Sequence, residues 1–281
     1  MEKPRSVLIT RLSAIGDVIH ALPVLEALRA QLPEARIGWV VEERSAPLLH
    51  HHPHIDKLYV IPKKRWRKNF RKYLLSEIIP FYKGIRRDGW DASIDLQGLS
   101  KSSFAARASG AKTRVGFAGP NAREISSLLN NKRIRPHDED VHVVEQNLRL
   151  LEGLGLEVPE LPPRGTLGIL EEERAVMREK LGEQGWHGEP LLAVNPGAGW
   201  ASKRWPPKFF AETARRIAEK KDVRPVVLWG PKEEPLRNEI LDVIPGIHPI
   251  AAPPTSVREL AVLISLCSLF VGGDTGPTHM A

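Results

Sequence analysis

The chain of 281 residues is poor in cysteine and aromatic residues, and it has no long apolar run. Its single cysteine, Cys267, excludes a disulfide within the chain and fits a reducing compartment such as the cytoplasm. Because Cys267 lies in an apolar stretch, we expect it to be a buried core residue. Residues Met1–Arg5 lead directly into a strand pattern, which predicts that there is no signal peptide. No apolar run approaches the length of a membrane span.

Positive charge is concentrated in the first half of the chain. The formal net charge is +7, but residues 1–150 hold 26 Lys and Arg against 16 Asp and Glu, whereas residues 151–281 hold 15 against 18. This asymmetry predicts that the first half meets an anionic partner. Nucleic acid, an acidic membrane surface and a phosphorylated or carboxylated substrate all satisfy that requirement.

Short apolar strands alternate with helical patterns along the whole chain, which is typical of α/β proteins with parallel sheets. The predicted strands cover residues 6–9, 37–41, 57–61, 92–96, 190–195, 226–230 and 269–273, and the predicted helices cover residues 18–28, 73–88, 99–109, 207–220 and 256–266. A Gly- and Pro-containing charged passage predicts a domain boundary near residue 160. We therefore expect two Rossmann-like domains, residues 1–160 and 161–281, that face each other across a cleft. The second domain ends on a strand and a turn without the following helix, which predicts that its C-terminal elements are truncated.

The turn after the first strand, Thr10–Asp17, is the first candidate site. Ligands of open α/β sheets bind at the carboxyl ends of the strands, and Asp17 stands there at the start of a helix. A carboxylate in that position fits a catalytic base. The alternative is that Asp17 only caps the helix, because Asp is favoured at helix N-caps in general.

Residues 63–72 hold seven cations interleaved with Trp66 and Phe70. The two aromatic residues favour a docking surface over a solvated loop, for single-stranded RNA or for an anionic carbohydrate. Gln97 and Lys101 follow another predicted strand and add polar groups at its carboxyl end. The histidines of the segment His50–His54 are broken by Pro53, which disfavours a metal site.

The second half contains a glycine-rich turn, Gly197–Gly199, followed by Lys203. It lacks a dinucleotide fingerprint because Ser202 stands where the third glycine is needed, and the chain has no P-loop pattern. These features disfavour hydride transfer and P-loop phosphoryl transfer. They favour a donor whose diphosphate is held by Gly197, Gly199, Lys203 and the turn Asp274–Gly276, with helix-start N–H groups nearby.

Five segments together resemble glycosyltransferase family 9, the ADP-heptose:lipopolysaccharide heptosyltransferases, and most of all its heptosyltransferase I branch. These segments are Ser13–His20, Trp39–Glu43, Arg65–Lys68, Asp95–Ser102 and Asp274–His279. The resemblance implies a GT-B fold and an inverting, metal-independent transfer that needs no cofactor beyond the donor ADP-heptose. It also implies that Asp17 is the catalytic base. The expected acceptor is Kdo-lipid A, which implies a peripheral contact with the cytoplasmic face of the inner membrane. We also expect a monomer that binds no nucleic acid.

The resemblance also assigns residues to the donor and the acceptor. The implied donor-binding residues are Gly199, Lys203, Glu233 or Glu234 for the ribose, Thr255, Asp274, Thr275, Gly276 and His279. The implied acceptor-binding residues are Ser13, Lys64, Arg67, Lys68, Gln97, Lys101 and Arg123. The chain departs from the heptosyltransferase I pattern at Ala198–Gly199, where two threonines are expected, and at Gln146, where an arginine is expected. The rival functions are heptosyltransferase II, acting on the first heptose, and an RNA-binding protein that uses residues 63–72.

Overall fold

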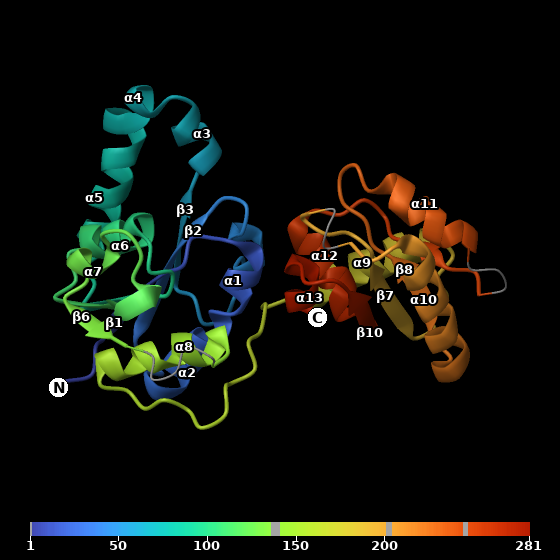
Figure 1. The fold of residues 1–281 in the computed structure, drawn as a ribbon. Helices are drawn as coiled ribbons and strands as arrows, with labels where there is room; N and C mark the ends of the chain where they lie inside the picture. The colour runs from blue at the N-terminus through green and yellow to red at the C-terminus, as the bar shows by residue number, and fades with distance from the viewer. Residues whose placement is uncertain (1, 136–140, 201–203, 244–246) are drawn as a thin grey trace. The chain divides into compact units, whose positions relative to one another are not determined.

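A computed structural model describes residues 2–135, 141–200, 204–243 and 247–281. The chain divides into two compact units, Met1–Gly168 and Ile169–Ala281 (Figure 1). The division lies further along the chain than the predicted boundary near residue 160. The extra residues pack against the first unit. The Thr166 carbonyl accepts a hydrogen bond from the His52 ring at 3.0 Å, and the Thr166 hydroxyl donates to the Glu26 carboxylate at 2.6 Å.

The first unit is built on a parallel sheet with the strand order β3-β2-β1-β4-β5-β6. The strands are β1 (Ser6–Thr10), β2 (Arg36–Glu42), β3 (Lys57–Ile61), β4 (Ala92–Asp95), β5 (Thr113–Phe117) and β6 (Lys132–Ile134). The helices are α1 (Ile15–Ile19), α2 (Leu22–Gln31), α3 (Lys63–Lys68), α4 (Phe70–Tyr73), α5 (Ile79–Arg87), α6 (Ser100–Ala108), α7 (Ser126–Leu129) and α8 (Val143–Arg149). The strand order reverses between β1 and β4, so ligands are expected at their carboxyl ends.

Helices cover both faces of this sheet, which explains why its central strands β1 and β4 are buried at every position. Val7 and Ile9 of β1 pack into the core beneath α2 and α8, which lie side by side (Figure 1). Leu8, between them in sequence, packs into the opposite core with Ile85 of α5 and Ala105 of α6. Because successive side chains of a strand point to opposite faces of the sheet, this one short strand contributes residues to both cores.

The helix predicted over residues 18–28 is two helices, α1 and α2, and the prediction of one continuous helix is wrong. Pro23 is at the start of α2, where its missing N–H costs nothing. In a continuous helix its ring would clash with the carbonyl of Ile19. The helix predicted over residues 73–88 is also divided, because a π-helical turn, Leu74–Ile78, separates α4 from α5.

The second unit repeats the design with a parallel sheet in the order β10-β7-β8-β9. Its elements are α9 (Glu171–Glu183), β7 (Leu191–Asn195), α10 (Pro207–Lys221), β8 (Arg224–Val227), α11 (Glu234–Val243), β9 (Ile250–Ala251), α12 (Val257–Ser265), β10 (Cys267–Gly272) and α13 (Gly276–Met280). Leu191 and Ala193 face one core and Leu192 and Val194 the other. The strand order here reverses between β7 and β10.

Two predictions for the end of the chain are corrected. Cys267 is half-buried at the start of β10, and its thiol donates to the carbonyl of Leu263 at 3.4 Å. Burial raises the pKa of that thiol to about 12. The helix expected to be missing after the last strand is present as the short α13. Among the helices of the described residues, none is long and apolar enough to cross a bilayer.

Candidate functional site

Asp17 is held at the carboxyl end of β1 by a buried arginine. The Arg11 guanidinium lies 2.8 Å from Asp17 Oδ1, and the backbone N–H of Ala14 donates to Oδ2 at 2.9 Å. Asp17 is thus the third residue of α1, reaching back to the N-cap, rather than the N-cap itself. Its side chain is nevertheless 45% exposed. The carboxylate therefore has a fixed orientation and an open side.

Arg11 connects the ends of the two central strands. Its guanidinium also donates to the carbonyl of Leu96, directly after β4. Burial lowers the pKa of this guanidinium, and the neighbouring Asp17 carboxylate opposes that shift. The Trp39 indole donates to the Arg11 carbonyl at 3.1 Å and fixes the backbone from the β2 side. Asp17 is consequently positioned by three strands of the sheet.

The turn after β4 is held by the fully buried Asp95. Its carboxylate accepts hydrogen bonds from the backbone N–H groups of Gln97 and Gly98, at 3.1 and 3.2 Å. It also accepts hydrogen bonds from the Ser103 hydroxyl and from the Asn130 side-chain amide. Gln97 in turn accepts the N–H of Leu12 at 3.0 Å, so its carbonyl oxygen joins the two turns.

Gly98 is required at this turn. Its φ is +66°, and a Cβ placed there would lie 2.2 Å from the carbonyl oxygen of Asn121. The Gly98 carbonyl accepts a hydrogen bond from the backbone N–H of Arg123 at 2.9 Å. Arg123 is thereby brought to the β4 end by its backbone, with an exposed side chain.

Glu42, at the end of β2, joins two lysines near the turn that follows β1. Its carboxylate is bound by Lys63 at 2.8 Å and by Lys101 at 2.9 Å, and only 7% of its side chain is exposed. Burial opposes ionisation of Glu42, but the two lysine contacts outweigh it and lower the pKa below the ordinary value. Lys101 also donates to the Ser13 hydroxyl at 3.2 Å. Ser13, Gln97 and Lys101, three predicted acceptor residues, are therefore gathered at one edge of the sheet.

The basic run of residues 63–72 forms α3 and the start of α4, not a loop. Lys64, Arg67 and Lys68 are exposed on α3. Trp66, in contrast, is buried in the core, and its indole donates to Glu77 at 3.0 Å. Trp66 is therefore not an exposed stacking residue, although it lines the pocket described next. Sequence alone could not show which aromatic side chain faces inward.

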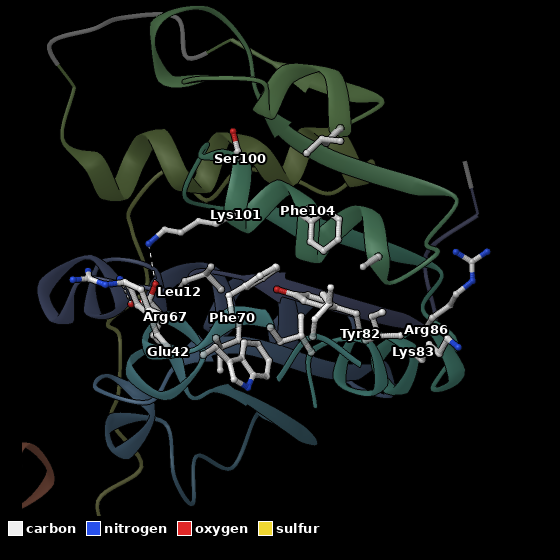
Figure 2. A pocket seen from close by; sticks show the side chains of 18 of the residues that line it. Leu12, Glu42, Arg67, Phe70, Tyr82, Lys83, Arg86, Ser100, Lys101 and Phe104 are labelled. Atoms are coloured by element: carbon white, nitrogen blue, oxygen red, sulfur yellow. Dashed lines mark hydrogen bonds and ion pairs between the residues drawn. The ribbon is translucent and has the colours of Figure 1, made fainter. Parts of the chain in front are cut away.

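A pocket of about 930 Å³ lies between α3–α5 and α6 (Figure 2). Lys101 and Arg67 stand at one end of it, and Phe70, Tyr82 and Phe104 line its middle. It adjoins the Glu42 cluster, so the polar edge near Asp17 continues into an apolar groove.

The second unit gathers its predicted donor residues at the carboxyl ends of its strands. Asn195, buried at the end of β7, donates to the Thr275 hydroxyl after β10 at 3.0 Å. This contact bridges the two strands between which the order reverses. Gly276 begins α13, and His279 in that helix lies 3.5 Å from the Asp274 carboxylate.

The structure distinguishes the two glutamates proposed for the ribose. The Glu233 carboxylate accepts the N–H of Gly230 at 2.8 Å and lies against Gly197, whose Cβ, if present, would be 2.6 Å from it. Glu233 therefore sits between the ends of β7 and β8, whereas Glu234 is the first residue of α11.

The remaining predicted donor residues come from loops at the same edge. Gly199 is exposed, with open space where a Cβ would stand. Thr255 is half-buried in the loop between β9 and α12. Lys203 lies outside the described residues.

Comparisons with known proteins agree with this arrangement. The sequence profile of glycosyltransferase family 9 (heptosyltransferase) matches residues 78–281. The chain belongs to glycosyltransferase family 9. Lipopolysaccharide heptosyltransferase 1 of Pseudomonas aeruginosa is 31% identical over 98% of this chain and 75% of its own length. The lipopolysaccharide core heptosyltransferase OpsX of Haemophilus influenzae is 27% identical over all of this chain and 76% of its own.

Solved structures give the same family. The E. coli heptosyltransferase WaaC with ADP-2-deoxy-2-fluoro heptose matches with a TM-score of 0.78 and 26% identity, over 98% of this chain and 84% of that chain. A family 9 glycosyl transferase from Veillonella parvula matches with a TM-score of 0.82 and 25% identity, over 100% of this chain and 79% of that chain. This family 9 chain is thus a glycosyltransferase with the GT-B fold, in which each of two α/β units is built on a parallel sheet.

The sequence did not single out three residues of the candidate site: Arg11, Glu42 and Asn195. Arg11 and Asn195 each stand at the end of a buried strand that precedes a predicted turn, and that position was the available signal. Within the described ranges no group of three potential metal ligands is found. The buried His52 of the histidine segment instead contacts the carbonyl of Thr166 at 3.0 Å.

Proposed function

We propose that this chain transfers a heptose from ADP-heptose to the Kdo of a lipid A acceptor, in the assembly of the lipopolysaccharide inner core. The observation that carries the proposal is the orientation of Asp17. Its carboxylate is held by Arg11 and by the N–H of Ala14 and remains open on one side. Relatives named lipopolysaccharide heptosyltransferase 1, and a solved relative with an ADP-heptose analogue, support the donor and the reaction.

The proposed mechanism is a single displacement with inversion. Asp17 accepts the proton of an acceptor hydroxyl while that oxygen bonds to the anomeric carbon of the heptose, and the bond to ADP breaks with its electron pair. Lys203 and the residues after β10 would stabilise the charge that develops on ADP. The transfer would use no metal ion and no resident cofactor.

Donor recognition would come from the strand ends of the second unit. We assign the ribose contact to Glu233 rather than Glu234, because the Glu233 carboxylate lies between the ends of β7 and β8. Gly199, Thr255, Asp274, Thr275, Gly276 and His279 would complete the donor site. Gly199 leaves room for a close backbone approach to the diphosphate.

The acceptor would bind at the basic edge of the first unit. Lys64, Arg67 and Lys68 on α3 and Arg123 after the β4 turn offer exposed cations to the Kdo carboxylates. Ser13, Gln97 and Lys101 would hold the reacting sugar beside Asp17. This concentration of cations favours the carboxylate-bearing Kdo over a heptose acceptor and hence heptosyltransferase I over II. Burial of Trp66 removes one of the two stacking rings that the RNA-binding alternative requires.

The test is a transfer assay with ADP-heptose and three acceptors. We expect product with a Kdo-bearing lipid A precursor and none with lipid A that lacks Kdo, and proton NMR should show an inverted anomeric configuration. Transfer only to an acceptor that already carries one heptose would assign the chain to heptosyltransferase II. Absence of transfer, together with salt-sensitive retention of single-stranded RNA in a filter-binding assay, would support the RNA alternative.

We also propose that the protein acts as a monomer at the cytoplasmic face of the inner membrane. The cations of α3 would meet anionic headgroups, each contributing about 1 kcal/mol close to the surface. Flotation with phosphatidylglycerol vesicles at low salt should recover the protein with the lipid, and 0.5 M salt should release it. Equal recovery with neutral phosphatidylcholine vesicles would contradict this proposal.

A further inference from the structure

The pocket beside the Glu42 cluster is an apolar groove with charged ends. It is lined by side chains from α4, the π-helical turn, α5 and α6, among them Leu74 and Ile78. Phe70, Tyr82 and Phe104 line its middle (Figure 2). Hydrogen-bonding groups are few there. The Trp66 indole already donates to Glu77, which leaves the Tyr82 hydroxyl.

The large apolar side chains of the groove are unusually exposed. Phe70 is 56% exposed, Phe104 49% and Ile125 54%. All three side chains line the pocket. A contiguous apolar surface of this kind in a soluble unit marks a binding site.

Cations stand at both ends of the groove. Arg67 and Lys101 lie at one end, where Lys101 contacts Ser13, and Lys83 and Arg86 lie at the other (Figure 2). Lys63 lines the pocket too and binds Glu42 together with Lys101. Among the described lining residues the one carboxylate is Glu42, which is already bound by two of these lysines. The groove therefore complements an anionic amphiphile rather than a cationic or zwitterionic one.

The apolar middle also selects between kinds of chain. An extended peptide would bury backbone N–H and C=O groups against side chains that cannot pair with them, at a high cost in free energy. A hydrocarbon chain carries no such groups. On α6, Lys101, Phe104 and Ala108 share one face and span about 10 Å along the helix. A headgroup at Lys101 can therefore extend its chain along that face.

We propose that this groove binds one acyl chain of the acceptor lipid, with the anionic headgroup at the Lys101 end. The inference rests on the proposed function, because it takes the acceptor to be a lipid. It assigns to α4–α6 a role in seating the lipid part of the substrate, apart from the sugar that reacts near Asp17.

The test is direct binding of alkyl phosphates to the full chain, measured by calorimetry below their micelle concentrations. The probes are inorganic phosphate and the octyl, decyl and dodecyl phosphates. We expect one site per chain and an affinity that rises with length, by up to about fourfold for each methylene buried. Affinity that is independent of chain length would overturn the proposal, as would equal binding of dodecyltrimethylammonium.

Two variants locate the site. Phe104→Asp places a carboxylate among the apolar side chains, and Ala108→Trp fills the groove from the same helix face. Each should weaken dodecyl phosphate binding about tenfold or more. Phe209→Asp is the matched control, since Phe209 is 44% exposed on α10 of the second unit, and it should bind as wild type does. Circular dichroism melting checks that each variant is folded.

The remaining outcomes separate this inference from the proposed function. Unchanged binding in both groove variants would overturn the assignment of the site. A dimer that Phe104→Asp dissociates, without alkyl phosphate binding in the wild type, would show that a second copy covers the groove and would overturn it as well. Length-dependent binding that the groove variants abolish, in a chain that transfers no heptose, would support the groove and contradict the proposed function alone.

Discussion

At the scale of single residues, the site depends on charges that are paired before any ligand binds. Arg11 holds Asp17, and Glu42 holds Lys63 and Lys101. The sequence predicted Asp17 and Lys101, because turn residues at strand ends are recognisable from local pattern. It did not predict their partners. Glu42 and Lys101 are 59 positions apart, and nothing in the local sequence distinguishes Glu42 from its neighbour Glu43.

The Glu42 pairs make a pH-dependent contribution to stability. Because the folded-state pKa of Glu42 is lowered, the contribution is fully present above the pKa of an unfolded glutamate, about 4.3. It is lost as the pH falls through the folded-state pKa. We expect Glu42→Gln to reduce the free energy of unfolding at pH 7 by about 1–2 kcal/mol, since both lysines are partly exposed.

Urea unfolding of the wild type and Glu42→Gln, followed by tryptophan fluorescence between pH 3 and pH 7, measures this difference. The gap should narrow below pH 4.3, and the exposed Glu239→Gln should show no gap at any pH. A difference that is as large at pH 3 as at pH 7 would contradict the assigned role of the Glu42 carboxylate.

In the second unit, we expect substitutions at Gly197 and at Glu233 to weaken ADP binding alike. A Cβ on Gly197 would lie 2.6 Å from both Glu233 carboxylate oxygens, so Gly197→Ala should displace that side chain. If Glu233 binds the ribose, both Gly197→Ala and Glu233→Gln should weaken ADP binding about tenfold, the cost of one charged hydrogen bond. Calorimetric titration with ADP measures this, with Glu234→Gln as the control expected to stay within about twofold. The reverse ranking of the two glutamates would assign the ribose to Glu234.

At the scale of elements, the connection from β4 to α6 is the most tightly specified part of the first unit. Asp95 accepts hydrogen bonds from its own turn, from Ser103 on α6 and from Asn130 after α7. We expect Asp95→Ala to lower the free energy of unfolding by about 3–5 kcal/mol, because several buried donors lose their acceptor at once. Denaturant unfolding measures this loss.

Ser93 is the matched control on the same strand. Its hydroxyl is buried and has no hydrogen-bond partner among the described residues. Ser93→Ala should therefore be neutral or slightly stabilising, since it removes a polar group that burial penalises. A loss for Ser93→Ala as large as that for Asp95→Ala would show that strand packing, not the carboxylate, holds the turn.

Element boundaries show why local sequence was sufficient for the strands and insufficient for some helices. Strands such as β1 and β7 are buried on both faces, so their apolar runs are visible directly. The division of α1 from α2 depends on where Pro23 falls within the helix, and the π-helical turn at Leu74–Ile78 has no sequence signal. Which face of the basic α3 turns inward depends on its contact with Glu77, eleven positions away from Trp66.

At the scale of the whole molecule, both units place their candidate residues at the point where the strand order reverses. In the first unit this point lies between β1 and β4, beside Asp17, and in the second between β7 and β10, beside Thr275. Alternating elements in the sequence predict such sheets, but the strand order that creates the reversal comes from non-local pairing. The resemblance to family 9, rather than periodicity, supplied the residue roles.

The proposed transfer depends most directly on Asp17 as the group that takes the proton. The decisive measurement compares heptose transfer and ADP binding in the wild type, in Asp17→Asn and in Asp242→Asn, an exposed carboxylate on α11. We expect Asp17→Asn to bind ADP as the wild type does and to lose about 10²–10⁴-fold in turnover, while Asp242→Asn should be unaffected. Transfer by Asp17→Asn within a few-fold of the wild-type rate would contradict it.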